Sequence, residues 1–301
     1  MPADAISTAA AVAPRNLLGL PRAELSDYFC EFGEKPFRAR QLMQWIYQRR
    51  VLDFDAMTDL SRDLRQRLCA TASLALPGIV QREVSEDGTR MWLIDVGGNQ
   101  AVETVFIPEP NRGTLCISSQ AGCAIDCAFC ATGQQGFNRN LTAQEILAQV
   151  LIAREELSAD ITNVVFMGMG EPLANYDNVL RAVRILVDDF GFGLSRRRVT
   201  ISTSGLVPQL LRLAGDCNVA LAVSLHATTD ELRNRLVPIN RLHPIEKLLD
   251  ACWEYAEVLA SRQVTFEYVM LADVNDCAED ARRLVRLLRN RPAKVNLIPF
   301  N

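Results

Sequence analysis

The sequence predicts an α/β fold in which an N-terminal helical module and a small antiparallel sheet precede a curved, partial (β/α)6 barrel. Two observations lead to this prediction. From residue 114 onwards, strand-like and helix-like segments alternate, and six such units are too few to close an eight-stranded barrel. Before residue 114, apolar residues recur first at helical spacing and then at the alternating spacing of strands. With 301 residues, of which 49% are hydrophobic, the chain can bury a large core.

The chain divides into four predicted parts. Residues 1–14 are Ala-rich and carry no basic residue before their apolar stretch, so we expect a disordered leader rather than a signal peptide. Residues 15–80 form the helical module, and residues 81–113 form the antiparallel linker sheet, with the Asp87-Gly88 dipeptide as a hairpin signal. Residues 114–301 form the partial barrel.

The expected elements follow from local pattern. In the module, helices are expected over residues 22–32, 38–50 and 61–74. The expected barrel strands are residues 114–119, 161–167, 198–203, 219–225, 264–270 and 294–299. Among the helices between them are 142–157 and 242–260. Thr142 and Glu145 have the spacing of a capping box, which satisfies free amides at a helix start.

Composition restricts the class of protein. Nine cysteines in a chain of this length do not indicate a secreted disulfide scaffold, and no run of eighteen apolar residues could span a membrane. The formal charge of -4 does not indicate nucleic-acid binding. The helical module alone carries ten Lys/Arg against eight Asp/Glu, a net of +2. This module is therefore the candidate RNA contact, although a solvated helix face explains any single basic pair equally well.

One short loop carries the strongest chemical signal. Cys123, Cys127 and Cys130 have the spacing C-x3-C-x2-C. Three thiolates at this spacing can hold a [4Fe-4S] cluster with one iron left open, and an open iron is what a radical S-adenosylmethionine (SAM) enzyme requires. The alternative is structural zinc, which takes four ligands. The only histidines, His226 and His243, are far away in the sequence, so the cluster is favoured. A reducing cytoplasm suits such a cluster.

Small or polar residues follow several of the predicted barrel strands. Because the carboxyl ends of parallel strands meet at one edge of a barrel, they predict one pocket lined from several directions. Gly170 lets backbone approach a ligand. Glu171 can accept hydrogen bonds from an ammonium or a ribose. The remaining candidates for binding SAM are Ser202, Ser224, Leu225, His226 and Asn301. Taken singly, each serine is explained as an ordinary turn and His226 as a core histidine.

The sequence pattern does not decide the roles of two further residues. Cys116 lies on the first barrel strand, where it is either a small buried side chain or a reactive thiol near the cluster loop. Glu103 lies between apolar neighbours in a strand, and composition favours a place on the solvent face.

Together these motifs resemble those of the RlmN-type dual-specificity RNA methyltransferases, which are radical SAM enzymes. The likeness extends from about residue 15 to the end of the chain. The matching segments are residues 102–105, 116–120, 122–130, 133–141, 168–172, 202–204, 224–226 and 295–301. The resemblance implies methylation of C2 of an adenosine in 23S rRNA, and of the adenosine next to the anticodon in certain tRNAs. Since C2 of adenine is not nucleophilic, this reaction needs a radical.

The resemblance also implies roles for single residues. In the family, one SAM methylates a cysteine in a C-terminal tail, and a second SAM yields a 5′-deoxyadenosyl radical that activates this methyl group for addition to adenine. The position of Cys116 then forms a disulfide with the carrier cysteine, and that of Glu103 accepts a proton. Gly170, Glu171, Ser202, Ser224, Leu225, His226 and Asn301 match the SAM contacts. The implied electron donor is a flavodoxin or ferredoxin, and we expect a cytoplasmic monomer.

One departure and three alternatives accompany this resemblance. No cysteine follows Cys277, so we expect the 301 residues to be a fragment that cleaves SAM without methylating RNA. Within the family, the alternative is a Cfr-like enzyme that methylates C8 of the same adenosine, although residues 134–137 resemble the C2 group. Outside it, the alternatives are a glycyl-radical activase and a non-enzymatic iron–sulfur protein.

Overall fold

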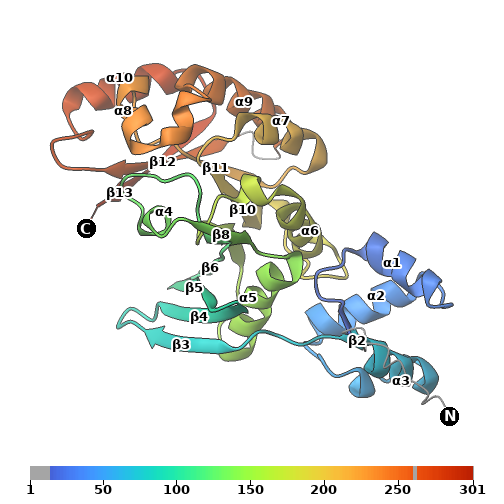
Figure 1. Cartoon of the computed structure of the whole chain (residues 1–301). Coiled ribbons are helices and arrows are strands. Elements are labelled where there is room, and N and C mark those ends of the chain that lie inside the picture. The colour runs from blue at the N-terminus through green and yellow to red at the C-terminus, as the bar shows by residue number, and fades with distance from the viewer. Residues whose placement is uncertain (1–13, 260–262, 301) are drawn as a thin grey trace, which may run out of the picture.

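A computed structural model describes residues 14–259 and 263–300, and most of its strands belong to one nine-stranded sheet (Figure 1). The predicted leader, apart from its last residue, and Asn301 lie outside the described residues. The strand order across the sheet is β13-β12-β11-β10-β9-β6-β5-β4-β3. The sheet therefore divides into a parallel part, which ends at β13, and an antiparallel part, which ends at β3.

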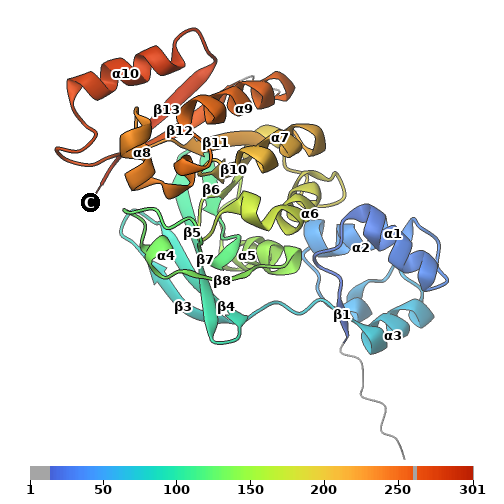
Figure 2. The ribbon, with the colours of Figure 1, turned by 45° about the horizontal axis from the view of Figure 1, so that its top comes forward.

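The parallel part is the predicted partial barrel. Its six strands follow one another in chain order: β6 (Arg112–Cys116), β9 (Asn163–Phe166), β10 (Val199–Thr203), β11 (Ala220–Ser224), β12 (Val264–Met270) and β13 (Ala293–Pro299). Helices between them cover the outer side of the sheet (Figures 1 and 2). These are α5 (Ala143–Glu156), α6 (Tyr176–Val187), α7 (Val207–Asp216), α8 (Asp230–Leu236), α9 (Ile245–Val258) and α10 (Ala278–Leu288). The expected capping box is confirmed at the start of α5.

The antiparallel strands extend the barrel sheet rather than forming a sheet of their own. They are β3 (Ile79–Val84), β4 (Arg90–Gly97) and β5 (Gln100–Glu109). The predicted hairpin turn joins β3 to β4, where Ser85 N–H donates to the carbonyl oxygen of Thr89 over 2.8 Å. Strand β5 pairs with β6, with Val105 opposite Cys116. The segment expected to be a linker is thus continuous with the parallel part of the sheet.

The N-terminal module is helical, as predicted. It contains α1 (Arg22–Glu31), α2 (Arg38–Met43), a π-helical turn over Gln44–Gln48, α3 (Arg62–Thr71) and the short paired strands β1 (Arg15–Asn16) and β2 (Ala72–Ser73). It packs against the outer helices (Figure 2). The rings of Tyr47 and Phe192 are 4.9 Å apart, and a Cβ at Gly19 would lie 2.6 Å from the amide nitrogen of Gln144. Module and barrel share one continuous core.

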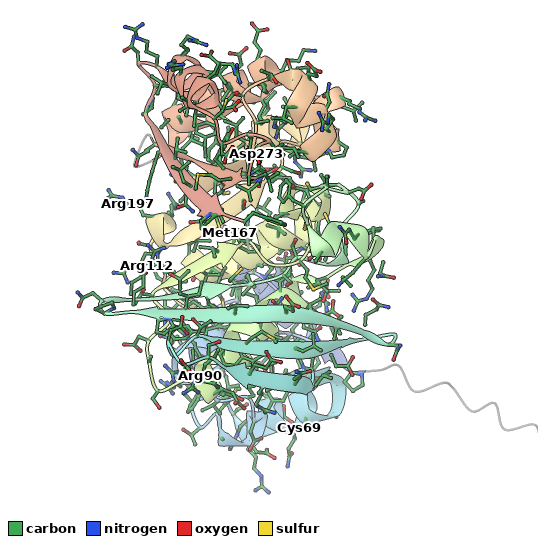
Figure 3. All side chains as sticks on the ribbon, turned by 90° about the vertical axis from the view of Figure 1, so that its left-hand side faces the viewer. Cys69, Arg90, Arg112, Met167, Arg197 and Asp273 are labelled. Carbon is green, nitrogen blue, oxygen red and sulfur yellow. The ribbon has the colours of Figure 1, made fainter. Side chains whose placement is uncertain are left out.

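The inner face of the sheet is only partly covered. Along β10, Val199, Ile201 and Thr203 are buried against the helices, whereas Thr200 and Ser202 on the inner face are half-buried. Met167, just beyond β9, is 40% exposed. In Figure 3 it lies between the antiparallel strands and the last strands of the barrel. This open inner face is where the sequence-predicted site residues meet.

Candidate active site

A cavity of about 270 Å³ lies at the carboxyl ends of the barrel strands. Its walls come from the cysteine loop, from the segments after β9, β10 and β11, and from β12 and β13. Of the residues predicted from the sequence, it is lined by Cys123, Cys127, Cys130, Gly170, Glu171, Ser202, Ser224 and His226. The structure therefore brings most of the predicted site together.

The cysteine loop is held at its base by a short hairpin. Strand β7 (Gln120–Gly122) precedes the loop and pairs with β8 (Phe137–Asn140), which follows it. Cys123 N–H donates to the carbonyl oxygen of Gly136 over 3.0 Å. Gly122 has a φ of 77°, and a Cβ there would overlap that same oxygen. Only glycine allows the two ends of the loop to approach this closely.

The three loop thiols lie around one cavity, as a cluster held by three cysteines requires. All three are half-buried and line the same cavity, and no other cysteine of the described residues lines it. Burial, together with the neighbouring thiols, raises the pKa of Cys127 to about 12, and burial also raises that of Cys123.

A platform beneath the loop positions it. Ile125, Cys127 and Phe129 pack on a small apolar cluster formed by Ala227, Leu236 and Val237, which is separate from the main core. Ala128 N–H donates to the carbonyl oxygen of Leu236 over 3.0 Å. The loop thus rests on α8 and on the turns that flank this helix.

Glu171 is buried and is held by three hydrogen bonds. Its Oε2 accepts from the amide of Ser204 over 2.7 Å and from the hydroxyl of Ser204 over 2.6 Å, while Oε1 accepts from Leu173 N–H over 3.0 Å. Burial raises the pKa of this carboxyl, and the hydrogen bonds from Ser204 and Leu173 oppose the shift. Glu171 therefore ties the segment after β9 to the segment after β10 and still presents a carboxylate to the cavity wall.

The glycine before it is required by the fold itself. Gly170 has a φ of 97°, and a Cβ there would lie 2.8 Å from the amide nitrogen of Gln120. The Gln120 side chain accepts from Glu171 N–H over 2.8 Å. Gly170 therefore lies close to β7 and also lines the cavity, where the approach of its backbone to a ligand stays a prediction.

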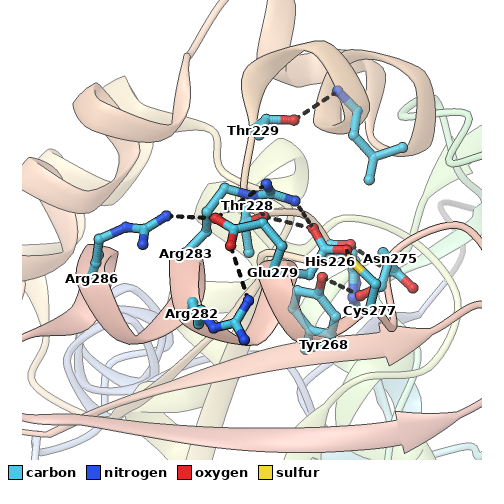
Figure 4. A network of polar contacts seen from close by, with 12 residues as sticks. His226, Thr228, Thr229, Tyr268, Asn275, Cys277, Glu279, Arg282, Arg283 and Arg286 are labelled. Carbon is cyan, nitrogen blue, oxygen red and sulfur yellow. Dashed lines mark hydrogen bonds and ion pairs between the residues drawn. The ribbon is translucent and has the colours of Figure 1, made fainter.

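The sequence allowed His226 to be either a core histidine or a residue of the binding site, and the structure shows a buried histidine at the cavity wall. The residue is 5% exposed and its Nδ1 accepts from Val269 N–H over 3.0 Å, so the proton of the neutral ring is on Nε2. Burial, with a smaller contribution from Arg233, lowers the pKa of His226 to about 3. Its carbonyl oxygen accepts from the side chain of Asn275 over 2.8 Å, which links the cavity to the loop before α10 (Figure 4). His226 is thus a satisfied buried histidine that also lines the cavity.

Three predicted residues lie apart from the cavity. The side chain of Leu225 is fully buried in the main core, so only its backbone is near the cavity. Cys116 and Glu103 lie on the inner face of β6 and β5, beyond Met167. Burial raises the pKa of Cys116 to about 11, and the charge of Glu103 adds to this shift. Glu103 is exposed, as composition suggested, but on the inner face of the sheet.

Two charged residues of the site were missed from sequence. Glu267 lines the cavity from β12, opposite Ser224 in the register, and accepts from Asn296 Nδ2 over 2.7 Å. One signal in the sequence could have identified Glu267. It has the inward-facing position on its strand that Ser202 and Ser224 have on theirs. Arg233 lies beneath the cavity wall, fully buried. No local signal distinguishes it, since the run Asp230–Leu236 reads as a solvated helix.

The partial barrel, with three cysteines and polar strand ends around one cavity, is the architecture of a radical SAM enzyme. Comparison with known families agrees: residues 117–287 match the radical SAM superfamily, and residues 15–74 match the ribosomal RNA large subunit methyltransferase N-terminal domain. The chain belongs to the RlmN family of radical SAM methyltransferases.

Individual relatives support this assignment. The chain is 57% identical over 289 residues to the dual-specificity RNA methyltransferase RlmN of Halorhodospira halophila, covering 96% of this chain and 80% of the relative. It is 56% identical to the RlmN of Alkalilimnicola ehrlichii, with 95% and 80% covered. A radical SAM methyltransferase from Sphaerobacter thermophilus has the same fold, with a TM-score of 0.88 and 45% identity over 96% of this chain and 86% of that structure.

Proposed function

We propose that this protein is a radical SAM RNA methyltransferase that adds a methyl group to C2 of adenosine in 23S rRNA and in tRNA next to the anticodon. The observation that carries the proposal is the shared cavity. Three cysteines at the spacing of a cluster loop and five of the polar or glycine residues predicted at strand ends line one space of about 270 Å³. Family membership supports the RNA substrate.

The loop residues would hold the [4Fe-4S] cluster through Cys123, Cys127 and Cys130. When bound, the cluster supplies the electron that cleaves SAM. The remaining cavity residues bind and orient SAM. Glu171 and Glu267 offer carboxylates, Ser202 and Ser224 offer hydroxyls, and His226 offers an Nε2–H donor. The side-chain contact proposed for Asn301 lies outside the described residues, and any contribution of Leu225 comes from its backbone.

Cys116 and Glu103 are proposed as the catalytic pair on the inner face. Cys116 is opposite Val105 in the register, and Glu103 lies two residues before Val105 on the same face of β5, so the two side chains are diagonal neighbours. With a pKa of about 11 the thiol is protonated at neutral pH, so it needs a base before it can form the disulfide that the resemblance implies. Glu103, exposed on the same face, is suited to accept a proton from the adduct.

Partners follow from the same proposal. The RNA would contact the N-terminal module, and the electron donor would be a flavodoxin or ferredoxin. In the described part of the chain, no helix has the length and apolarity needed to cross a bilayer. We propose a monomer that works in the cytoplasm.

Product analysis tests the function. The protein is reconstituted anaerobically with iron and sulfide and incubated with SAM, reductant and unmodified 23S rRNA or tRNA. We expect 5′-deoxyadenosine from SAM with these 301 residues, and 2-methyladenosine in digested RNA when a cysteine that carries the methyl group is also present. Formation of 8-methyladenosine would assign the Cfr-like activity instead, and SAM cleavage that depends on a protein substrate would indicate an activase.

A further inference from the structure

Arg233 is a buried arginine whose hydrogen bonds all go to uncharged acceptors. Its side chain is 0% exposed. Nε donates to the carbonyl oxygen of Leu225 over 3.0 Å, and Nη1 donates to Oδ1 of Asn240 over 2.9 Å. Nη2 donates to the carbonyl oxygens of Ser204 and Ser224 over 2.7 and 2.8 Å. The guanidinium therefore joins α8 to the ends of β10 and β11.

These contacts satisfy the donors without cancelling the charge. A buried cation is costly in a protein interior unless an opposite charge compensates it. Burial accordingly lowers the pKa of Arg233 to about 10. At neutral pH the guanidinium is still charged. The carboxylate of Asp230 favours the charged form of Arg233, but it accepts its hydrogen bonds from Asn240 Nδ2 and from Ile245 N–H, each over 2.9 Å, and not from the guanidinium.

Arg233 is bonded to the wall of the cavity that the cysteine loop lines. Its Nη2 donates to the carbonyl oxygens of Ser204 and Ser224, and both residues line this cavity together with Cys127. The helix that carries Arg233 also carries Leu236, which receives the amide of Ala128 and packs against the loop. Arg233 is thus the buried cation of the platform on which the cluster ligands rest.

We propose that Arg233 is a positioning residue of the cluster site, whose buried positive charge stabilises the thiolate-bound [4Fe-4S] cluster and favours its reduced state. One-electron reduction by an external donor adds one negative charge to the site. A fixed cation nearby stabilises that added charge and raises the reduction potential, because net charge and second-shell groups set the potentials of such clusters. This inference rests on the proposed cluster site.

The test is a redox titration of the reconstituted protein, followed by EPR of the reduced cluster. Arg233→Gln removes the charge and keeps a donor. We expect its equilibrium constant for reduction to fall at least tenfold, which is a shift of about 59 mV to more negative potential for one electron. Arg233→Lys keeps the charge, and we expect its constant to stay within about threefold of the wild type. The matched control is Arg235→Gln, which removes an exposed charge from the same helix and should change nothing.

A second variant compensates the charge instead of removing it. Asn240→Asp would place a carboxylate against Nη1 and leave the three bonds to backbone carbonyls in place, while losing the donation from Asn240 Nδ2 to Asp230. We expect the same negative shift. If Arg233→Gln does not fold, the potential of Asn240→Asp alone tests the role of the Arg233 charge. If both variants fold but load no iron while Arg233→Lys and Arg235→Gln load fully, the stabilising role is supported. Loss of the cluster in Arg233→Lys as well would overturn it.

The outcomes separate this inference from the proposed function. A wild-type chain that binds no four-iron cluster would overturn both the proposed function and the role of Arg233. A loaded Arg233→Gln or Asn240→Asp protein with the wild-type potential, or an equal shift in Arg235→Gln, would overturn the role of Arg233 and leave the proposed function standing.

Discussion

Glu171 accepts two hydrogen bonds from Ser204, one from the backbone amide at 2.7 Å and one from the hydroxyl at 2.6 Å. The pair joins the ends of two neighbouring parallel strands, β9 and β10, at the wall of the cavity. Both residues are buried. The shape of the cavity therefore depends on a carboxylate that is also a candidate ligand of SAM.

Glu171→Gln should weaken both the fold and SAM binding. An amide nitrogen placed against the Ser204 donors leaves buried groups unsatisfied, which costs about 1–3 kcal/mol. We expect this loss in the free energy of urea unfolding and a lower affinity for SAM in equilibrium dialysis. Glu155→Gln, at an exposed position of α5, is the control and should match the wild type. Unchanged stability in Glu171→Gln would show that the two hydrogen bonds contribute little.

The cysteine loop provides a second prediction. Replacing Cys123, Cys127 or Cys130 by alanine should abolish the absorption and EPR signals of the cluster together with SAM cleavage, because three thiolates are the minimum set at this site. Cys69→Ala, at an exposed cysteine of the module, should load iron normally. A triple loop variant that still bound four irons would contradict the assignment.

The Cys116 thiol should react slowly. With its pKa raised from 9.0 to about 11, the thiolate fraction at pH 8 is lower by a factor of about 100, and alkylation by iodoacetamide should slow accordingly. Glu103→Gln removes the nearby negative charge, so the pKa should fall and alkylation should become faster. Peptide mass mapping measures both rates. Glu109→Gln, further along β5, serves as the control, and a rate in Glu103→Gln equal to this control would place Glu103 too far from the thiol to influence it.

Neutral His226 should make the fold sensitive to acid. Its pKa is about 3 in the folded chain and about 6.5 when unfolded, so the unfolded state binds the extra proton between these values. Its stabilising contribution is complete above pH 6.5 and is lost as the pH falls toward 3, with about 2 kcal/mol lost at pH 5.

His226→Asn isolates this effect. Asparagine tolerates the φ of 56° found here and offers an acceptor near the position of Nδ1. Urea unfolding of the metal-free variant should lose about 2 kcal/mol less than the wild type between pH 7 and pH 5. An equal loss in both proteins would assign the acid sensitivity to other titrating groups.

RNA binding by the module should depend on salt. Several guanidinium groups there lie over aromatic rings: Arg38 over Phe37 at 4.9 Å, Arg40 over Phe190 at 5.7 Å and Arg49 over Trp45 at 4.1 Å. Replacing these three and Arg50 by glutamine should reduce the slope of log K against log salt by about 0.9 for each duplex phosphate that is no longer neutralised. The comparison variant replaces Arg196, Arg197 and Arg198. A larger effect there would move the RNA surface to the barrel.

Sequence patterns were sufficient for the features that depend on neighbouring residues. The spacing of Cys123, Cys127 and Cys130 and the capping box at Thr142 are local, because their geometry is set within a few residues. The alternation of strands and helices predicts the order of the parallel strands, since crossovers between such strands have one hand. That order is enough to assign Ser202, Ser224 and His226 to one cavity.

Tertiary structure decided the features that depend on distant partners. The pairing of β5 with β6 made the expected linker part of the main sheet and placed Glu103 on the same face as Cys116. Arg233 reads as one of several arginines in a polar helix, and only the packing of α8 beneath the cysteine loop buries its charge. Whether a charged side chain is exposed or buried depends on long-range strand pairing and helix packing. The local pattern of residues therefore does not predict it.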